Sequence, residues 1–402
     1  MKIIHIQAGM SPAGNAAFRL HALMKKEGIK SSILLWKPTS FNRNDIQAIG
    51  KSSSGLIYRG INAIKNILIT KLKKPNTYFY SSMPRITSNN ILPYIYDADI
   101  IYLHWIAGNF LSTKDIKKIA KLGKPVIFFM HDMWTMTGGC HHSFDCKEYE
   151  NGCKRCCLFP QKANFARIES KKKQKLFTQF NNLYFVSPSE WMANCAKRSY
   201  ILKSKPVFQI PNVIDEEVFK PINKKTARYI LNLPQDKFII TFGCIAGTKN
   251  PWKGWDYLRD AINLLKLPDI HLVIYGSDYD ENTVKQLQYP ITFLGPILDE
   301  YVLSLICNSS DLFVSPSLAE SFGLTFLENI LCGTPVIGFD CTAIPEIVKT
   351  NQTGYLAQYK NKKDIVKGIT LLHERKGLFT PKIKYLSNDV IKMHLDLINS
   401  IK

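Results

Sequence analysis

Short apolar segments rich in β-branched and aromatic residues alternate with helical patterns through both halves of this chain. The first half contains IIHIQ, SSILLW, DIIYLHW, PVIFFMHD, LYFVSPS and PVFQIPN, and the second contains KFIITFGC, HLVIYGS, ITFLGP, DLFVSPS and PVIGFD. Strands that alternate with helices form a parallel sheet that helices cover on both faces. Ligands of such sheets bind beyond the carboxyl ends of the strands, so the residues that follow the strands are the first candidates for function.

The chain is long enough for two such sheets. It has 402 residues, 46% of them hydrophobic, and single cores rarely grow beyond about 300 residues. A short linker around residues 206–221 separates the halves. We therefore expect an α/β protein with one domain at residues 1–211 and another at 212–384. The N-terminus reads as a strand rather than a signal peptide, and no apolar run could span a bilayer, so a cytoplasmic protein is expected.

The stretch DLFVSPSLAESFGLTFLENILCGTPVIGFDCTAIPEIV, residues 311–348, is the most informative part of the chain. It predicts a strand, a short loop, a helix from Ser321 to Leu331 that Gly333 ends, and a second strand. Ser321 is the expected N-cap. The first amides of such a helix point at whatever lies above the sheet and bind phosphate or diphosphate well. The amides in question are those of Phe322, Gly323 and Leu324.

Two carboxylates flank this helix start. Glu320 precedes it and Glu328 lies eight residues later, about 12 Å along a helix, which is the reach from a sugar across a diphosphate to a ribose. Carboxylates accept hydrogen bonds from sugar hydroxyls. Two solvated surface glutamates are the alternative interpretation. The coincidence of this spacing with SFG at the helix start and PEI after the next strand favours a binding site.

The segments ESFGLTFLE, CGTPVI and IPEIV resemble glycosyltransferase group 1, family 4 of the sugar transferases. This resemblance implies a GT-B fold, in which two Rossmann-like doubly wound domains face a cleft and a C-terminal helix, here residues 385–402, completes the N-terminal domain. It also implies a retaining, metal-independent transferase that uses a UDP- or GDP-sugar and no catalytic cofactor. By resemblance, Glu320 contacts the donor sugar, Glu328 contacts the ribose, and the amides of residues 321–324 contact the diphosphate.

Further candidates follow strands of the first half. Gly9, Gly14 and Asn15 follow the first strand. Glycines there usually only make the turn, but by resemblance these residues lie in the glycine-rich loop that faces donor and acceptor. His131 ends the strand PVIFFM and precedes Asp132. A lone histidine is more often structural, yet the strand end and the resemblance of HDMW favour a contact with the donor sugar.

Lysines after the first strand of the second half are candidates for binding the diphosphate. This segment reads GCIAGTKNPWKG, and Lys253 could neutralise the diphosphate as it leaves. A solvated lysine is the alternative. The resembling family usually has an arginine six residues before this lysine, where this chain has Gly247, so Lys249 is the candidate for the second charge.

The segment GGCHHSFDCKEYENGCKRCC is rich in potential metal ligands. Its C-x5-C-x6-C-x2-C spacing resembles a zinc knuckle of four thiolates, which would be a structural site. Free buried thiols and two disulfides are the alternatives, and His141, His142 and Cys157 compete as ligands. Residues 137–160 have little apolar content, so we expect zinc to order them. The four expected ligands are Cys140, Cys146, Cys153 and Cys156.

The formal net charge of +21 indicates an anionic partner, which could be nucleic acid, anionic lipid or a phosphorylated substrate. Residues 56–74 form a basic amphipathic pattern that suits either an anionic membrane surface or the core. The basic run at residues 171–175 is expected to be a solvated helix face. One helical stripe of residues 56–74 carries the apolar residues Ile57, Ile61, Ile64, Leu68 and Leu72.

Taken together, these features predict a retaining glycosyltransferase with a nucleotide-sugar donor. The family it resembles commonly builds capsule or O-antigen polysaccharide on a lipid-linked oligosaccharide acceptor at the inner face of the plasma membrane, and the basic charge fits such an acceptor. A nucleotide-sugar epimerase of the same fold is one alternative, although the paired glutamates argue against it. A basic zinc-knuckle protein that binds nucleic acid is the other, but it leaves those glutamates unexplained, so no nucleic-acid partner is expected.

Overall fold

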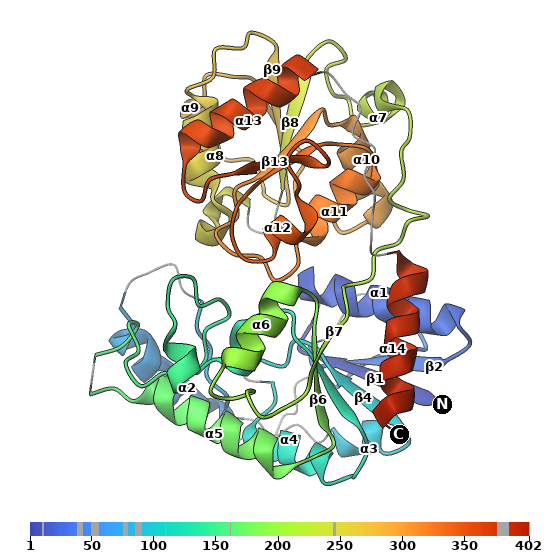
Figure 1. Cartoon of the computed structure of the whole chain (residues 1–402), viewed down its shortest axis with the longest axis vertical. Helices are drawn as coiled ribbons and strands as arrows, with labels where there is room; N and C mark the ends of the chain where they lie inside the picture. The colour runs from blue at the N-terminus through green and yellow to red at the C-terminus, as the bar shows by residue number, and fades with distance from the viewer. Residues whose placement is uncertain are drawn as a thin grey trace. The chain divides into compact units, whose positions relative to one another are not determined.

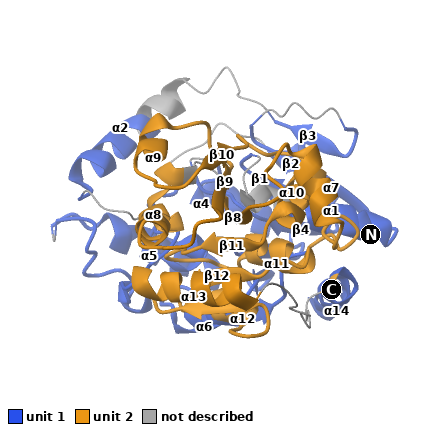
Figure 2. Cartoon of the chain, turned by 90° about the horizontal axis from the view of Figure 1, so that it is seen from above, with its two compact units in different colours: residues 1–213, 387–402 blue, residues 214–386 orange. Residues whose placement is uncertain are grey.

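The computed structural model places most of the chain. It contains two compact units: residues 1–213 with 387–402 form unit 1, and residues 214–386 form unit 2 (Figure 2). Each unit is built on one parallel sheet (Figure 1). The structure describes residues 1–9, 12–37, 43–49, 56–74, 79–84, 91–108, 110–160, 162–243, 247–375 and 386–401.

The sheet of unit 1 has the strand order β3-β2-β1-β4-β5-β6-β7, with all pairs parallel. Its strands are β1 Lys2–Gln7, β2 Lys30–Leu35, β3 Ile46–Ala48, β4 Ile100–Leu103, β5 Val126–Phe129, β6 Leu183–Ser187 and β7 Val207–Gln209. The helices are α1 Pro12–Lys26, α2 Leu56–Leu72, α3 Leu92–Ile95, α4 Thr113–Ala120, α5 Phe165–Gln179, α6 Glu190–Arg198 and α14 Ser387–Ile401, with short 3-10 turns η2 Met133–Met136 and η3 Glu148–Asn151.

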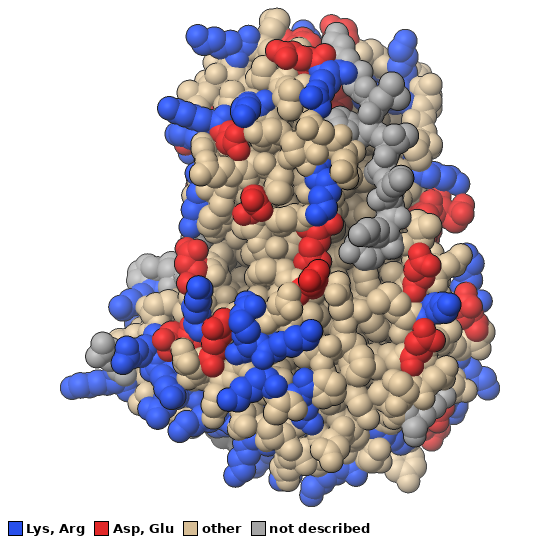
Figure 3. All heavy atoms as spheres, in the orientation of Figure 1, with Lys and Arg blue, Asp and Glu red and all other residues tan. Residues whose placement is uncertain are grey.

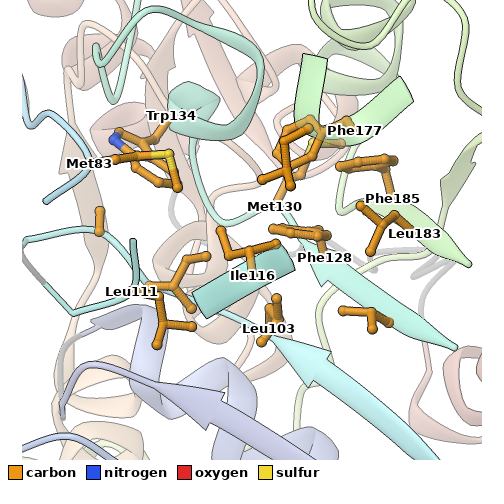
Figure 4. Close-up of a cluster of buried hydrophobic side chains, with 14 of the residues drawn as sticks. Met83, Leu103, Leu111, Ile116, Phe128, Met130, Trp134, Phe177, Leu183 and Phe185 are labelled. Carbon is orange, nitrogen blue, oxygen red and sulfur yellow. The ribbon is translucent and has the colours of Figure 1, made fainter. Parts of the chain in front are cut away.

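Both faces of this sheet are buried, as expected for parallel strands flanked by helices. Alternate residues of β4 face opposite cores, because successive side chains of a strand point to opposite sides: Leu103 joins one cluster and Tyr102 the other. On the first side, Phe128 stacks on Phe185 at 5.1 Å between ring centroids (Figure 4). On the second side, α1 and α14 cover the sheet, and His394 of α14 lies 3.1 Å from the Tyr102 hydroxyl.

Unit 2 has the strand order β10-β9-β8-β11-β12-β13, also parallel throughout. Its strands are β8 Phe238–Gly243, β9 Ile270–Tyr275, β10 Ile291–Phe293, β11 Leu312–Ser315, β12 Val336–Phe339 and β13 Gly354–Ala357. Its helices are α7 Lys224–Ile230, α8 Trp255–Ile262, α9 Glu281–Lys285, α10 Glu300–Ser309, α11 Leu324–Leu331, α12 Ile344–Ile347 and α13 Lys362–Arg375, with 3-10 turns η4 Gly247–Lys249 and η5 Pro251–Lys253.

The strand order determines where each unit can hold a ligand. In unit 1 the chain proceeds outward in opposite directions from β1 and β4, and in unit 2 it does so from β8 and β11. Loops leave such a pair of strands in opposite directions and open a crevice at their carboxyl ends. The predicted site residues after β8 and β11 therefore lie at the crevice position of unit 2.

Candidate functional site

The loop after β11 reaches α11 through a left-handed glycine. Gly323 is the N-cap of α11, with φ 98° and ψ 49°, so the predicted N-cap, Ser321, is wrong. A residue with a β-carbon is strained in this conformation, and a β-carbon at Gly323 would lie 3.0 Å from Cδ2 of Phe326. The helix therefore begins at Leu324. Its first outward amides are those of Leu324 and Thr325 rather than that of Phe322.

The loop between β11 and α11 is held on both sides by its neighbours. The amide of Leu318 donates to the carbonyl of Trp252 in η5 at 2.7 Å. The amide of Glu320 donates to Oγ1 of Thr342, which follows β12, at 3.0 Å. These bonds fix the backbone of Glu320 at the mouth of α11 between the loops that follow β8 and β12.

Lys253 and Glu320 meet at this point. Nζ of Lys253 lies 2.5 Å from Oε1 of Glu320, and the two side chains are 21% and 13% exposed. The next residue, Gly254, has φ 73°, and a β-carbon there would lie 1.9 Å from the carbonyl oxygen of Pro316. Only glycine permits this approach. The loops after β8 and β11 thus bring a cation and a carboxylate together beside the N-terminus of α11.

The other two predicted residues of this unit differ in their exposure. Glu328 lies on α11 and is buried, with only 4% of its surface exposed. Lys249 ends η4 and is exposed. The structure therefore has a buried carboxylate on α11, four residues after the helix begins, and a second lysine on the same loop as Lys253.

In unit 1, His131 follows β5 and is only partly buried. Its Nε2 lies 2.8 Å from Nδ1 of His104. Burial lowers the pKa of His131 to about 4, so its ring is neutral at physiological pH. Sequence reasoning did not single out His104, although the motif LHW at a strand end is the signal that could have found it.

Asp132 organises the loop that follows His131. It caps η2 by accepting from the amide of Trp134 at 2.7 Å, it lies 2.6 Å from Nδ1 of His141, and it accepts from Nε1 of Trp105 at 3.2 Å. Burial alone would raise the pKa of Asp132, but His141 and the Trp134 amide hold it near 2. These contacts engage the carboxylate in positioning the loop.

The glycine-rich segment after β1 is only partly described. Gly9 lies beside the side chain of Lys37, and a β-carbon there would lie 3.3 Å from Cδ of Lys37. Helix α1 begins at Pro12. Gly14 and Asn15 thus fall in its first turn, and their side chains lie outside the described residues.

The predicted zinc site is not supported. Cysteines of residues 137–160 line one small cavity, but no group of three or more His, Cys, Asp or Glu side chains among the described residues could hold a metal ion. Cys153 instead accepts from the amide of Gly138 at 3.3 Å, and burial raises its pKa to about 12. The four cysteines Cys140, Cys146, Cys153 and Cys156 are free thiols.

The segment is ordered by burial, contrary to the expectation that it could not be. Leu158 and Phe159 are 1% and 2% exposed and pack against Ile69 of α2. Tyr149 and Cys153 join the main core of unit 1. A few apolar residues of this segment thus anchor it in the core of unit 1, which composition alone does not reveal.

Lys173 corrects another expectation. It lies in the run predicted to be a solvated face of α5, yet it is 1% exposed. Its Nζ donates to the carbonyls of Trp134 at 2.5 Å and Thr137 at 3.2 Å, and lies 3.5 Å from the centroid of the Trp134 ring. Burial lowers the pKa of Lys173 to about 7. This lysine fixes the loop that follows His131.

Comparison with known proteins identifies unit 2. Residues 239–375 match the family model described as "Glycosyl transferases group 1". This unit belongs to the glycosyl transferases group 1 family. The resemblance expected from ESFGLTFLE and the adjoining segments is therefore confirmed, and the matched residues include the Lys253–Glu320 pair and α11.

Curated relatives match this chain over part of their length. D-inositol 3-phosphate glycosyltransferase of Mycobacteroides abscessus is 32% identical over 175 residues, which are 41% of this chain and 38% of that protein. An uncharacterized glycosyltransferase of Haemophilus influenzae is 29% identical over 150 residues, 34% of this chain and 42% of that protein. The chain thus matches less than half the length of these relatives.

A solved structure matches over the whole chain. HepE of Anabaena, in complex with UDP and glucose, has a TM-score of 0.68 and 16% sequence identity, and the match covers 100% of both chains. At this identity the likeness concerns the fold alone. It confirms the expected fold class, the GT-B fold with two Rossmann-like parallel-sheet domains.

Proposed function

We propose that this protein is a retaining glycosyltransferase that moves a sugar from a nucleotide-sugar donor to an acceptor hydroxyl. The observation that carries the proposal is the contact of Lys253 with Glu320 beside the N-terminus of α11. Lys253, Glu320 and the first amides of α11 lie together where the strand order of unit 2 reverses, and this combination suits a nucleotide-sugar donor. The amides and the lysine suit the diphosphate, and the carboxylate suits the sugar hydroxyls.

Known structures support a nucleotide-sugar donor. HepE of Anabaena, which shares the fold, has been solved with UDP and with UDP-glucose. In this chain, Glu328 would accept hydrogen bonds from the ribose, and the outward amides of α11 would bind the diphosphate. Lys249 would supply a further charge. A UDP-sugar is therefore the first donor to test, with GDP-sugars second.

The chemistry we infer is displacement on one face of the sugar. The bond between the anomeric carbon and the diphosphate breaks, and the acceptor oxygen bonds to the same face. The acceptor proton passes to the departing phosphate. Lys253 would stabilise the negative charge that develops on the diphosphate, while Glu320 would hold the sugar. These roles require orientation and charge stabilisation, with no metal ion as a participant.

We further propose that the acceptor is lipid-linked and that the protein binds it at a membrane surface. Helix α2 presents apolar side chains to solvent: Ile64 is 70%, Ile67 is 55% and Leu68 is 47% exposed. Lys65 points inward instead and pairs with buried Glu169 at 2.8 Å. The predicted stripe therefore does not face the core at Ile64 and Leu68, which favours the membrane alternative.

Charge supports the same surface. Basic side chains gather on the left side of unit 1 in the view of Figure 3, in the region that holds α2 and α5 in Figure 1. No helix in the described part of the chain is both long and apolar enough to cross a bilayer. We infer peripheral binding to the inner face of the plasma membrane and a role in capsule or O-antigen synthesis.

The alternatives lose support. The nucleic-acid hypothesis depended on a zinc knuckle and on a solvated basic run. No metal-binding group occurs among the described residues, and Lys173 of that run is buried. Among the residues of unit 2 that the structure describes, no contact favours an epimerase over a transferase.

Calorimetric titration of the purified full chain with UDP, GDP and their sugars tests the donor site. We expect one nucleotide to bind, and Lys253→Met to weaken it at least tenfold, since a hydrogen bond to a charged group contributes about 1.5–3 kcal/mol. Lys285→Met is the matched control, because Lys285 is exposed and paired with Glu281 in the same unit. Equal binding by the two variants would refute the placement of the site.

A further inference from the structure

Three histidines at the edge of the first sheet form a hydrogen-bonded series. Nδ1 of His5 lies 2.9 Å from Nε2 of His104, and Nδ1 of His104 lies 2.8 Å from Nε2 of His131. His5 lies on β1, His104 directly follows β4, and His131 lies two residues after the end of β5. The series therefore begins at the strand-order reversal of unit 1 and runs along the carboxyl edge of the sheet.

Stacking fixes the orientation of these rings. The centroids of His5 and His104 are 5.2 Å apart and those of His104 and His131 are 5.1 Å apart. Phe129 stacks on His131 at 4.8 Å. His5 and His104 are 0% and 6% exposed, whereas His131 is only partly buried. A ligand can therefore reach the series only at His131.

The number of ring protons determines whether His131, the accessible end of the series, donates or accepts a hydrogen bond. Burial lowers the pKa of all three histidines, so each neutral ring carries one N–H. Two of the three protons lie between the rings, and the third lies at one end, on Nε2 of His5 or on Nδ1 of His131. Within the described part of the chain, Nε2 of His5 is buried without a hydrogen-bond partner. A buried N–H without an acceptor is rare in proteins, so the third proton belongs on His131.

We propose that His5 and His104 are positioning residues that hold His131 as the Nδ1–H tautomer, so that its ring donates a hydrogen bond to a hydroxyl oxygen of the donor sugar. This inference rests on the proposed function for the identity of the ligand. It adds a specificity: a hydroxyl accepts this hydrogen bond, whereas a protonated amino group in the same place cannot. The site therefore prefers a donor sugar with a free hydroxyl at the position that faces His131.

Nuclear magnetic resonance of the full chain with 15N-labelled histidine tests the tautomer directly. The correlations between ring nitrogens and carbon-bound protons differ for the two tautomers, and loss of one signal set in His131→Gln assigns that residue. We expect the wild-type protein at neutral pH to show His131 as Nδ1–H without any substrate. An Nε2–H tautomer or a doubly protonated ring of His131 would overturn the proposal that His5 and His104 set its tautomer.

Two substitutions of His104 distinguish control of the His131 tautomer through hydrogen bonds from a role in packing alone. His104→Phe keeps an aromatic ring against Phe129 and His131 but removes both hydrogen bonds, so His131 should shift toward the Nε2–H tautomer. His104→Asn loses the stacking but places an amide donor near Nε2 of His131, so the Nδ1–H tautomer should be retained. A purely structural role predicts that Phe performs at least as well as Asn, and that result would overturn the proposal.

Kinetics then test the sugar contact. His104→Phe should lower kcat/KM for the donor about tenfold, the loss of one hydrogen bond, and His104→Asn should recover most of it. If His104→Phe does not fold, the wild-type spectrum and the His104→Asn variant still test the tautomer of His131. Absence of transfer from every donor, with His131 present as Nδ1–H, would overturn the sugar assignment and the proposed function but not the tautomer. If an active transferase shows His131 as the Nε2–H tautomer, only the positioning role of His5 and His104 is overturned.

Discussion

Nζ of Lys253 lies 2.5 Å from Oε1 of Glu320, and this contact joins the loop after β8 to the loop after β11. Both side chains are partly exposed, and ion pairs near water contribute little to stability. The contact matters because it positions both side chains: each charge holds the other where the strand order of unit 2 reverses. A nucleotide sugar would exchange this contact for two others, phosphate on the lysine and sugar hydroxyl on the carboxylate.

Replacing Glu320 tests which step its carboxylate serves. Glu320→Gln keeps the shape and removes the charge, so we expect kcat to fall more than donor affinity, since the contact we propose for Glu320 is with the reacting sugar. Initial rates at varied donor concentration separate the two effects. A variant with the wild-type kcat would place the reacting sugar elsewhere.

Glu328 should instead affect donor binding. Glu328→Ala is expected to weaken binding by about 1.5–3 kcal/mol, the range for a hydrogen bond to a charged group. Because Glu328 is buried, the measurement needs a thermal unfolding curve beside the titration. Glu328→Gln is the matched control for shape. Unchanged affinity in a folded Ala variant contradicts a contact with the ribose.

Gly254 and Gly333 provide a matched pair for the close approach of the two loops. Both have positive φ, at 73° and 82°. A β-carbon at Gly254 would meet the carbonyl oxygen of Pro316 at 1.9 Å, whereas at Gly333 nothing lies within 4 Å. Gly333→Ala should cost about 1–2 kcal/mol of unfolding free energy, from the backbone conformation alone. Gly254→Ala should cost more and also weaken donor binding. Similar costs for both, measured by denaturant unfolding, would contradict this.

Lys173 makes stability depend on pH in a predictable direction. Its pKa is lowered by burial to about 7 in the folded protein from 10.5 in the unfolded chain, so between these values the unfolded chain binds more protons. Stability therefore rises with pH across this window through Lys173. Lys173→Met should remove that part of the rise. We would measure unfolding free energies of both proteins from pH 7 to 10, and parallel curves would refute the assignment.

Sequence patterns revealed much of the architecture and part of the site. Strands and helices were predictable because their apolar residues recur at periods of 2 and 3.6. The N-cap of α11 was missed because the glycine conformation depends on Phe326 and the neighbouring loops. Burial of Lys173 among exposed lysines was missed for a similar reason. A single inward position in a basic run is set by tertiary packing, and charge patterning alone does not reveal it.

Acid should destabilise unit 1 through its buried histidines. Burial lowers the pKa of His5 and His104 well below 6.5, that of His131 to about 4 and that of His394 to about 3. Between pH 4 and 6.5 the unfolded chain therefore binds more protons, and the stability present above pH 6.5 is lost as the pH falls. Hydrogen exchange at pH 7 and pH 5 should show faster opening of β1, β4 and α14 at the lower pH. Protection factors, which correct for the slower intrinsic exchange of amides at lower pH, should fall there, and a rise would contradict the neutral state of these rings.

Helix α2 should bind anionic membranes through a surface that can be removed without unfolding the protein. Ile64, Ile67 and Leu68 are exposed, so changing all three to serine should abolish binding to liposomes that contain anionic lipid while leaving the melting temperature unchanged.

Lysines at the end of this helix should contribute the electrostatic part of the same binding. Replacing Lys71, Lys73 and Lys74 with glutamine should weaken it by about 1 kcal/mol per charge near the surface, and wild-type binding should weaken with salt. The matched control replaces Lys171, Lys172 and Lys175 of α5, which are also exposed. Equal binding to neutral and anionic liposomes would refute an electrostatic surface. Equal loss in both lysine variants would mean that net charge, rather than α2, determines attachment.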